Sequence, residues 1–558
     1  MLTAYPRPQL QRDSYFCLNG EWELTIAQKD SDMENAFFTV IQVPYPPESK
    51  ASGVGRRIAA DEVMYYHKTF SVPVPANQDR TILHFGAVDQ QCEVMLNGQR
   101  LGEHKGGYLP FSFDITDVLQ ERNELIVKAV DTLDYTYPLG KQRNDNGGMW
   151  YTPFSGIWQT VWIEQVPQRY ITSLKLTPSL HDVRIEISDN TGKATETELV
   201  VETPNGSLTW RFCADAVNVP IPEPKLWTPE NPYLYRFSIR RGEDAVKSYF
   251  AMRTVSVGEV DGIPRILLNG KPYFFHGLLD QGYWENGICL PDSDDGYEKD
   301  IRFAKSLGFN MLRKHIRIEP LPFYEACDRL GMTVFQDFVN NGPHRYYRDT
   351  LLPNIGFVYE NDTKRRLPEA VKTVFRQTMA DTVRHLYNAP CIVYWTIFNE
   401  GWGQHDADAM YALLQSLDDT HVIDATSGWF WQSQSDVDSY HMYFAQLKQF
   451  GGKRPLVLSE FGGYSYNSDG KRYGYRFFKT EQAYREAICK LYREQIIPAV
   501  KKGLCAAVYT QISDVEDEQN GLITYDRAKE KVSAYDMLPI ANELYGQIQR
   551  WNTQAPCR

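Results

Sequence analysis

The sequence has no long apolar run, no basic tract and no paired cysteines, and each absence excludes a class of protein. No segment reaches the roughly 18 apolar residues of a membrane-spanning helix, and the first residues lack the apolar core of a signal peptide. A net charge of −12 without a basic run argues against nucleic acid or an anionic membrane as partner. The nine cysteines include no Cys-x-x-Cys pair, so we expect neither a disulfide scaffold nor a zinc site, and a reducing, cytoplasmic location.

Aromatic residues are what the chain has in plenty. They make up 13% of the sequence, with 12 Trp and 35 Tyr. Two interpretations remain open: large β-rich cores, or rings that line a sugar site, since the apolar faces of sugars stack on aromatic rings. A chain of 558 residues is also too long for one hydrophobic core, so two to four domains are expected.

The patterning divides the chain into three regions. Residues 1–166 read as short alternating strands, with an Asn97-Gly98 hairpin turn, and predict a jelly-roll-like β-sandwich. Residues 167–257 continue the pattern in a smaller unit and predict an immunoglobulin-like sandwich. From residue 258 to 558, strand-like runs alternate with helical patterns, such as those at 297–307 and 369–387, which is typical of a parallel α/β domain.

The third region contains eight apolar runs of strand length, the usual content of a (β/α)8 (TIM) barrel. The predicted strands are 274–279, 310–315, 333–338, 391–398, 422–425, 440–443, 456–459 and 506–509. In such barrels the working residues lie at the C-terminal ends of the strands.

Two of these strands end on a glutamate. The fourth runs into Asn399 and Glu400, and the seventh runs into Glu460. One such glutamate alone is as well explained by a solvated loop or an ion pair, but two at one barrel mouth favour a pair that works together. Glycoside hydrolysis requires such a pair, one carboxyl protonated and the other ionised, with environments that separate their pKa values.

At this point the chain resembles glycoside hydrolase family 2, the family of β-galactosidases, β-glucuronidases and β-mannosidases. The resemblance covers essentially the whole chain, including the order of the three domains. Its motifs are residues 148–158, residues 227–235, the pair Asn399-Glu400 and the stretch 459–462 with the sequence Ser-Glu-Phe-Gly.

The resemblance implies a role for each matching residue. Glu400 resembles the acid/base, Glu460 the nucleophile and Asn399 the residue that binds the sugar 2-hydroxyl. Tyr443 resembles the tyrosine that hydrogen-bonds the nucleophile, near His441 on the sixth strand. Arg313 and His315 resemble the Arg/His pair of the pocket floor.

Several of these residues also have a structural interpretation. For His315 and His441 the alternative is a structural histidine whose ring nitrogens are hydrogen-bonded within the protein. Arg313 is expected to neutralise Glu460. Asp337 ends the third strand, where it either binds a hydroxyl or anchors a loop. Three residues after the first strand are either sugar contacts or loop packing: Asp280, Tyr283 and Trp284.

The chain also departs from the family pattern. The stretch 514–522 lacks the lysine with which family glucuronidases hold a substrate carboxylate, and its acidic residues are expected to repel a uronic acid. Arg317 is the remaining candidate cation for a substrate carboxylate. It lies beyond the second strand, so its side chain would have to turn into the pocket. Tyr509 stands where a tryptophan is common on the eighth strand. The extra C-terminal domains of long β-galactosidases are not seen, so their metal sites do not transfer.

The sequence therefore predicts a retaining exo-glycosidase acting on β-glycosides, most of all a β-galactosidase-like enzyme. β-Glucuronidase, β-mannosidase and arabinosidase activities are the alternatives, in that order. A non-catalytic carbohydrate-binding protein is the alternative from another class, although both carboxylates are present. The expected partner is a carbohydrate, with no nucleic acid, membrane, cofactor or metal, and a homo-oligomer is left open.

Overall fold

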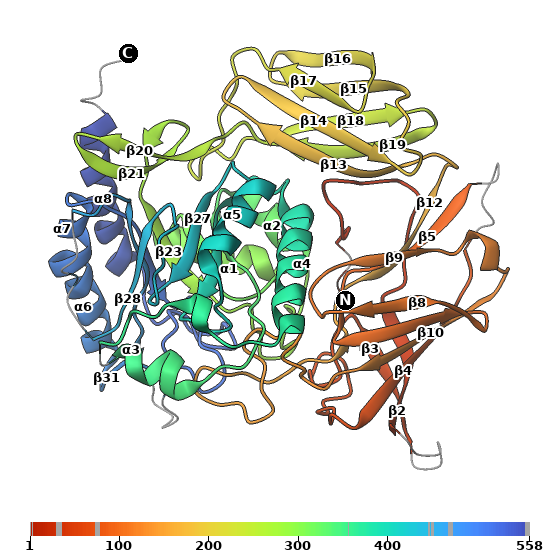
Figure 1. Ribbon diagram of the computed structural model, residues 1–558, viewed down its shortest axis with the longest axis horizontal. Coiled ribbons are helices and arrows are strands. Elements are labelled where there is room, and N and C mark those ends of the chain that lie inside the picture. The colour runs from red at the N-terminus through yellow and green to blue at the C-terminus, as the bar shows by residue number, and fades with distance from the viewer. Residues whose placement is uncertain are drawn as a thin grey trace.

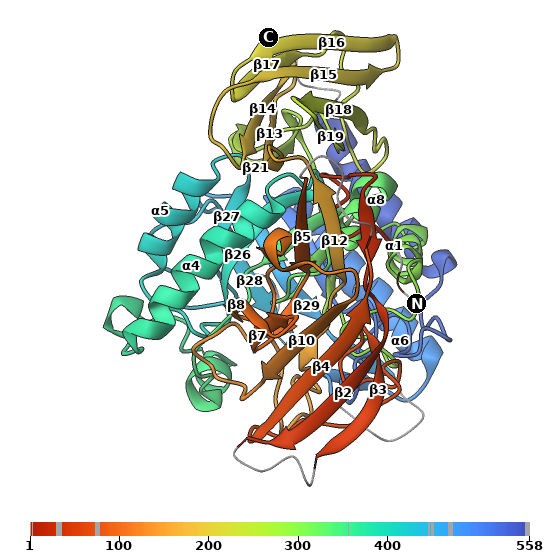
Figure 2. The ribbon, with the colours of Figure 1, turned by 90° about the vertical axis from the view of Figure 1, so that its right-hand side faces the viewer.

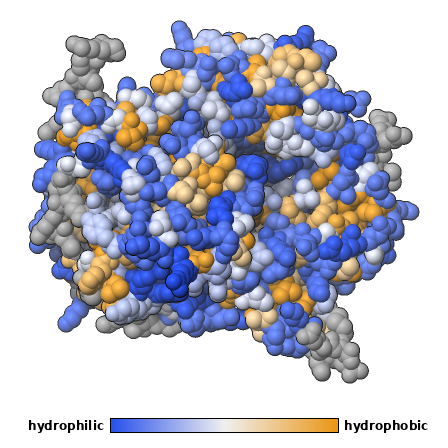
Figure 3. All heavy atoms as spheres, in the orientation of Figure 1, coloured by the Kyte–Doolittle hydropathy of each residue, from blue (hydrophilic) through white to orange (hydrophobic). Residues whose placement is uncertain are grey.

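In a computed structural model, the chain forms two β-sandwiches and a barrel (Figure 1). The structure describes residues 2–552 except 3, 30–35, 73–78, 355, 445–446, 448–450 and 467–472. Hydrophilic residues cover most of the face seen in Figure 3, and the apolar residues there form small scattered groups. None of the described helices is both long and apolar enough to cross a membrane. The eight cysteines within the described ranges are all free thiols.

The first sandwich packs a four-stranded antiparallel sheet, β1-β12-β5-β9, against a six-stranded one, β3-β2-β4-β10-β7-β8 (Figure 2). Alternate residues of β10 are buried, as the sequence pattern predicts. The predicted hairpin is confirmed: β7 and β8 are joined through Asn97 and Gly98, which both have positive φ. The strands are β1 Tyr15–Cys17, β2 Gly20–Gln28, β3 Phe37–Val43, β4 Glu62–Phe70, β5 Arg80–Phe85, β6 Val88–Asp89, β7 Gln91–Leu96, β8 Gln99–Lys105, β9 Phe111–Asp114, β10 Asn123–Val130, β11 Gly156–Ile157 and β12 Val161–Val166.

The second sandwich has a three-stranded sheet, β13-β14-β17, and a four-stranded sheet, β16-β15-β18-β19. Their apolar faces enclose a separate core. The strands are β13 Ile171–Pro178, β14 Asp182–Asp189, β15 Glu196–Thr203, β16 Gly206–Cys213, β17 Ala216–Pro220, β18 Tyr235–Arg241 and β19 Asp244–Phe250. The β-sandwich and immunoglobulin-like domains predicted for this part of the chain are thereby confirmed, while their exact boundaries stay a prediction.

A small antiparallel sheet that the sequence analysis did not predict precedes the barrel. It comprises β20 Val255–Val260, β21 Ile263–Leu268 and β22 Lys271–Pro272. Its short alternating strands have the same period as those of the sandwich before it, so the sequence pattern does not separate the two. The sheet lies between the second sandwich and the first barrel strand in the chain (Figure 1).

Eight parallel strands then form the barrel, in the order β27-β26-β25-β24-β23-β32-β29-β28. Each strand coincides with a predicted one. They are β23 Phe275–Asp280, β24 Met311–Lys314, β25 Thr333–Asp337, β26 Ile392–Asn399, β27 Val422–Ser427, β28 Asp438–Met442, β29 Leu456–Gly462 and β32 Leu504–Thr510. Within the described residues no strand ladder joins β27 to β28, so the barrel is closed except at that seam.

Helices surround these strands, and α4 lies on the side that faces the first sandwich (Figures 1 and 2). They are α1 Gly296–Ser306, α2 Leu321–Leu330, α3 Leu352–Asn354, α4 Glu369–Leu386, α5 Ala407–Leu417, α6 Glu481–Leu491, α7 Ile497–Val500 and α8 Ala534–Asn552. At the mouth, β30 Tyr464–Tyr466 pairs with β31 Arg476–Phe478.

Three carboxyl groups are buried together in the first sandwich. Asp89 and Asp131 are almost fully buried, and Oε1 of Glu48 is shielded from solvent with no hydrogen-bond partner among the described residues. Ser155 donates from its backbone N–H to Glu48 and from its hydroxyl to Asp131. Burial raises the pKa of Glu48 to about 8 and that of Asp131 to about 6.

These raised values predict a stability that falls as pH rises. Folded Glu48 keeps its proton up to about pH 8, whereas the unfolded carboxyl loses it near pH 4.5, so the folded state binds more protons in that window. Glu48→Gln removes the part of this dependence that Glu48 contributes. We expect its melting temperature to exceed that of the wild type at pH 8.5, and the difference to shrink or reverse at pH 5. Parallel pH curves for the two proteins would show that Glu48 is ionised in the folded state.

Candidate active site

The sequence places a carboxylate at the end of two fully buried barrel strands. Every residue of β26 and β29 is buried, so each strand holds its terminal residues in fixed positions. Glu400 follows β26 directly and has φ of 52°, a left-handed conformation that is uncommon outside glycine and is concentrated at functional sites. Glu460 lies near the end of β29. Gly462 follows at φ of 82°, where a Cβ would lie 2.4 Å from the ring of Tyr509.

Glu460 is surrounded by groups that stabilise its ionised form. Arg313 Nη1 lies 3.0 Å from Glu460 Oε1, and the hydroxyl of Tyr443 donates to Oε2. Burial by itself raises the pKa of Glu460, but the neighbouring positive charges, foremost that of His441, outweigh burial and lower the pKa to about 2. The pKa of His315 is itself lowered to about 4 by burial, so that ring is neutral near pH 7 and Arg313 is the permanent charge at the site.

Glu400 lies opposite Glu460 and contacts His441. His441 Nδ1 is 2.7 Å from Glu400 Oε1 and 3.5 Å from Glu460 Oε2. Its Nε2 is 2.9 Å from the hydroxyl of Ser427, at the end of β27. The side chain of Glu400 is 18% exposed, compared with 5% for Glu460, so Glu400 is the carboxylate more open to solvent.

The two carboxylates are close enough to act on one bond. One oxygen of Glu400, one of Glu460 and a ring nitrogen of His441 all lie within 4.8 Å of one another. This trio also has the composition of a metal site. Within it, His441 Nδ1 and Glu400 Oε1 share a hydrogen bond.

Arg313 joins the ends of four strands. It donates to both oxygens of Asp337 at 3.0 Å, to Oδ1 of Asn399 at 2.9 Å and to the carbonyl of Ser459 at 3.0 Å. Asp337 also lies 2.8 Å from Nδ1 of His315. The pKa of Asp337 is lowered to about 2, because Arg313 outweighs the effect of burial. The expected contact between Arg313 and Glu460 is confirmed.

Other predicted site residues lie outside this hydrogen-bonded cluster. Asp280 is 2.7 Å from the ammonium of Lys314, which faces away from Arg313 as strand alternation predicts. The indole of Trp284 is covered by the guanidinium of Arg527, and Tyr509 is fully buried. Tyr283 packs against Tyr151 of the first sandwich. The sugar-contact roles of Asp280, Trp284 and Tyr509 stay predictions.

Arg317 does not swing into the pocket. It is 2% exposed, its Nε lies 2.8 Å from Glu319, and an Nη donates to the carbonyl of Cys289. Its guanidinium also lies over the rings of the first sandwich's motif, Phe154 and Trp158. Arg317, left open by the sequence as a cation for the pocket, instead anchors the sandwich on the barrel.

Three carboxylates of the acidic run that follows β32 have partners of their own, and for Asp514 that partner is a cation. Asp514 pairs with Lys531 at 2.6 Å. Glu516 accepts from Asn146 and from the backbone N–H of Thr152. Glu518 accepts from the hydroxyl of Tyr151 and, at 3.1 Å, from Asn520. The sequence argument that this run repels an anionic sugar took no account of these partners.

The first sandwich supplies part of the mouth. The ends of the barrel strands in the sequence give no sign of this contribution. Trp150 packs edge-on against Trp402, three residues beyond the end of β26, and against His344. Across the mouth, Tyr475 stacks on Tyr443 with ring centroids 3.5 Å apart. In the sequence, the motif at 148–158 contains Trp150 and is the signal for this contribution.

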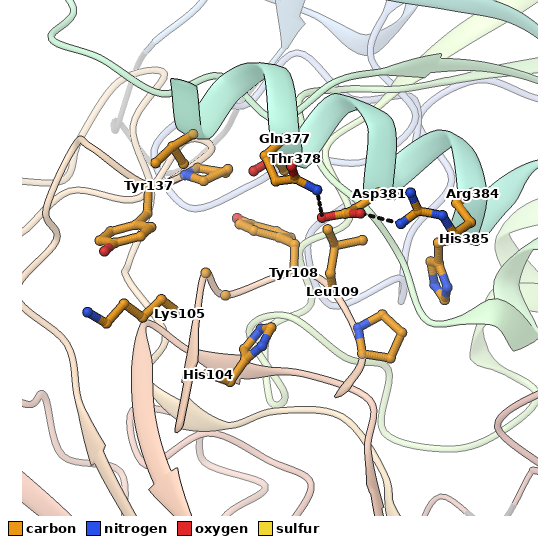
Figure 4. Close-up of a pocket in the computed structure, with 15 residues that line it drawn as sticks. His104, Lys105, Tyr108, Leu109, Tyr137, Gln377, Thr378, Asp381, Arg384 and His385 are labelled. Carbon is orange, nitrogen blue, oxygen red and sulfur yellow. Dashed lines mark hydrogen bonds and ion pairs between the residues drawn. The ribbon is translucent and has the colours of Figure 1, made fainter. Parts of the chain in front are cut away.

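A separate cavity of about 490 Å³ lies outside the barrel, between α4 and the first sandwich (Figure 4). Tyr108 and Leu109 line it from the sandwich, and an ion pair of Asp381 and Arg384 lines it from the helix. Neither Glu400 nor Glu460 lines this cavity.

Comparisons with known proteins find matches in all three parts of the chain. The models of glycosyl hydrolases family 2 match in three parts: the sugar binding domain over residues 36–167, a family 2 domain over 169–253 and the TIM barrel domain over 259–530. A β-galactosidase of Thermoanaerobacter pseudethanolicus is 24% identical over 472 residues, 78% of this chain and 58% of that protein. A putative β-glucuronidase of Formosa agariphila is 24% identical over 455 residues, 72% and 50% respectively.

The chain spans about half the length of the curated relatives it matches. Its fold extends over whole solved structures. A β-glucuronidase from an uncultured Clostridium sp. superposes with a TM-score of 0.74 at 18% identity, covering 98% of this chain and 99% of that one.

Proposed function

The chain belongs to the glycosyl hydrolases of family 2, and on that premise we propose that it is a retaining exo-β-glycosidase. The observation that carries the proposal is the pair of carboxylates, whose nearest oxygens are within 4.8 Å. Retaining enzymes separate their carboxyl groups by about 5–5.5 Å, whereas inverting enzymes need roughly 6.5–9.5 Å to admit a water molecule.

The environments of the two carboxylates support different roles for them. Glu460, ionised and held by Arg313 and Tyr443, attacks the anomeric carbon while the bond to the leaving oxygen breaks. Glu400, more exposed and hydrogen-bonded to His441, donates its proton to that oxygen. Water then enters, gives a proton back to Glu400 and displaces Glu460 from the sugar.

The sandwich supports exo action, because it covers one side of the mouth. The segment that contains Trp150 and Tyr151 contacts the barrel at Trp402 and at Glu518. A mouth closed on one side forms a pocket for a terminal sugar, whereas an open groove accepts the middle of a chain. The non-catalytic alternative does not explain why an ionised Glu460 is buried beside a second carboxylate.

Two sugar classes remain candidates for the non-reducing position. The named relatives at 24% identity include both a β-galactosidase and a putative β-glucuronidase. The argument for a neutral galactoside came from the acidic run. Its carboxylates pair with Lys531 and accept hydrogen bonds from Asn146 and Tyr151, so the run does not decide between the two classes.

The leaving group tests the assignment of Glu400. Glu400→Gln cannot donate a proton, so kcat/KM for a phenyl β-glycoside is expected to fall by about 10³-fold, whereas that for a dinitrophenyl β-glycoside, which needs little protonation, falls less than about tenfold. Glu369→Gln, an exposed glutamate on α4, is the matched control. Equal losses on both substrates would remove Glu400 from the role of acid.

A further inference from the structure

A loop of the first sandwich is fixed on the barrel mouth by backbone contacts. The N–H of Leu139 donates to the carbonyl of Asn340, beyond the end of β25. A Cβ on Gly140 would lie 3.1 Å from the carbonyl of Ile316, beyond the end of β24. The carbonyl of Lys141 accepts from the N–H of Tyr151 at 2.9 Å. The backbone of Lys141 is therefore held over the second and third strands, independently of its side chain.

The ammonium group of Lys141 lies near His315 and Glu518, two residues close to Glu460. Its positive charge, after burial, is the next largest influence that lowers the pKa of His315, and it counteracts the rise that burial causes in the pKa of Glu518. Glu518 in turn feels the charge of Glu460. These residues follow β24, belong to β29 and lie in the segment after β32, so the ammonium of Lys141 acts on groups from three sides of the barrel mouth.

Lys141 is also a cation without a partner within the described ranges. The structure gives its side-chain nitrogen no hydrogen bond or ion pair there, and the residue is half-buried. The neighbouring cations are committed: Arg313 to Asp337 and Glu460, and Lys314 to Asp280. Desolvating an unpaired ammonium is costly, which favours an anionic ligand as the missing partner.

We propose that Lys141 binds the carboxylate of a β-linked hexuronic acid, so that the substrates are β-uronides. This inference rests on the proposed glycosidase function. A sugar carboxylate beside the ionised Glu460 would be repelled without a cation, and Lys141 supplies that charge from the sandwich.

The test compares Lys141→Met and Lys141→Arg with the wild type. Nitrophenyl β-glucuronide and β-galacturonide are assayed beside nitrophenyl β-glucoside and β-galactoside. Wild type is expected to prefer a uronide. Lys141→Met should lose roughly 10- to 100-fold in kcat/KM on it, as for a lost hydrogen bond to a charged group, and change less than about threefold on neutral glycosides. Lys141→Arg should restore part of the loss.

Two results would overturn the proposal. A wild type that cleaves only neutral glycosides would contradict the substrate class while leaving the glycosidase function intact. Equal losses on uronides and neutral glycosides would show that Lys141 only holds Glu518 in place. If no glycoside of either class were cleaved, the proposed function itself would fail. Lys299→Met, an exposed lysine of α1, is the matched control.

Binding gives a readout that does not depend on turnover. Glucuronate and galacturonate are titrated into the wild-type protein by calorimetry, with glucose and galactose as neutral counterparts. Binding of one uronate, weakened roughly 10- to 100-fold by Lys141→Met and unchanged by Lys299→Met, is the expected result. Uronate binding that is equal in wild type and Lys141→Met would contradict the role of Lys141.

Discussion

Replacing Glu460 by glutamine is expected to abolish turnover on every substrate. The variant keeps the shape of the side chain but loses the nucleophile, so kcat/KM should fall by at least about 10⁴-fold, for activated and unactivated glycosides alike. This lack of dependence on the leaving group separates Glu460 from Glu400. Steady-state assays on phenyl and dinitrophenyl glycosides measure the fall in kcat/KM and its dependence on the leaving group.

Azide distinguishes the roles independently of rate. In Glu460→Ala, azide occupies the space of the lost carboxylate and attacks the anomeric carbon directly, which gives a glycosyl azide of inverted configuration. In Glu400→Ala, azide attacks the glycosyl-enzyme and gives a retained product. A retained azide from Glu460→Ala would show that another residue is the nucleophile.

Replacing Arg313 by methionine is expected to lower both stability and activity. Arg313 is 1% exposed and is the shared partner of Asp337 and Glu460. Its loss leaves two buried carboxylates uncompensated, which costs about 3–5 kcal/mol of folding stability. The pKa of Glu460 should rise because a permanent positive charge is removed. Melting curves and the acid limb of kcat/KM measure the two effects.

A second substitution keeps this prediction testable if the single variant fails to fold. Asp337→Asn removes one uncompensated charge, so the double variant with Arg313→Met should be more stable than Arg313→Met alone. Arg211→Met, a surface arginine paired with Glu198, should change the melting temperature little. An Arg313→Met protein as stable as the wild type would contradict the description of this network.

The sequence predicted the barrel well because its strands are buried on both sides. Each of the eight appears as an apolar run, and their order in the chain is the order of a repeated βα pattern. The positions of Glu400 and Glu460 at the mouth followed from the ends of those runs. The contacts of Tyr443 and Arg313 with Glu460 followed from the resemblance to the family.

The contributions of the first sandwich could not be predicted in the same way. Lys141 and Trp150 belong to loops of another domain, and their positions depend on how the two domains dock. The hydrogen bonds of the acidic run at 514–522 could not be predicted for a similar reason, because Tyr151 and Asn146 come from that same sandwich segment. A residue's charge is visible in a sequence, but its hydrogen-bond partner across a domain interface is not.

The configuration of the first product tests the central claim most directly. A nitrophenyl β-glycoside that the enzyme cleaves is hydrolysed with a large amount of enzyme in deuterated buffer, and the anomeric proton is followed by NMR before mutarotation mixes the anomers. The β-anomer should appear first, because two displacements at the anomeric carbon, by Glu460 and then by water, restore its configuration. Initial appearance of the α-anomer would contradict a covalent intermediate on Glu460.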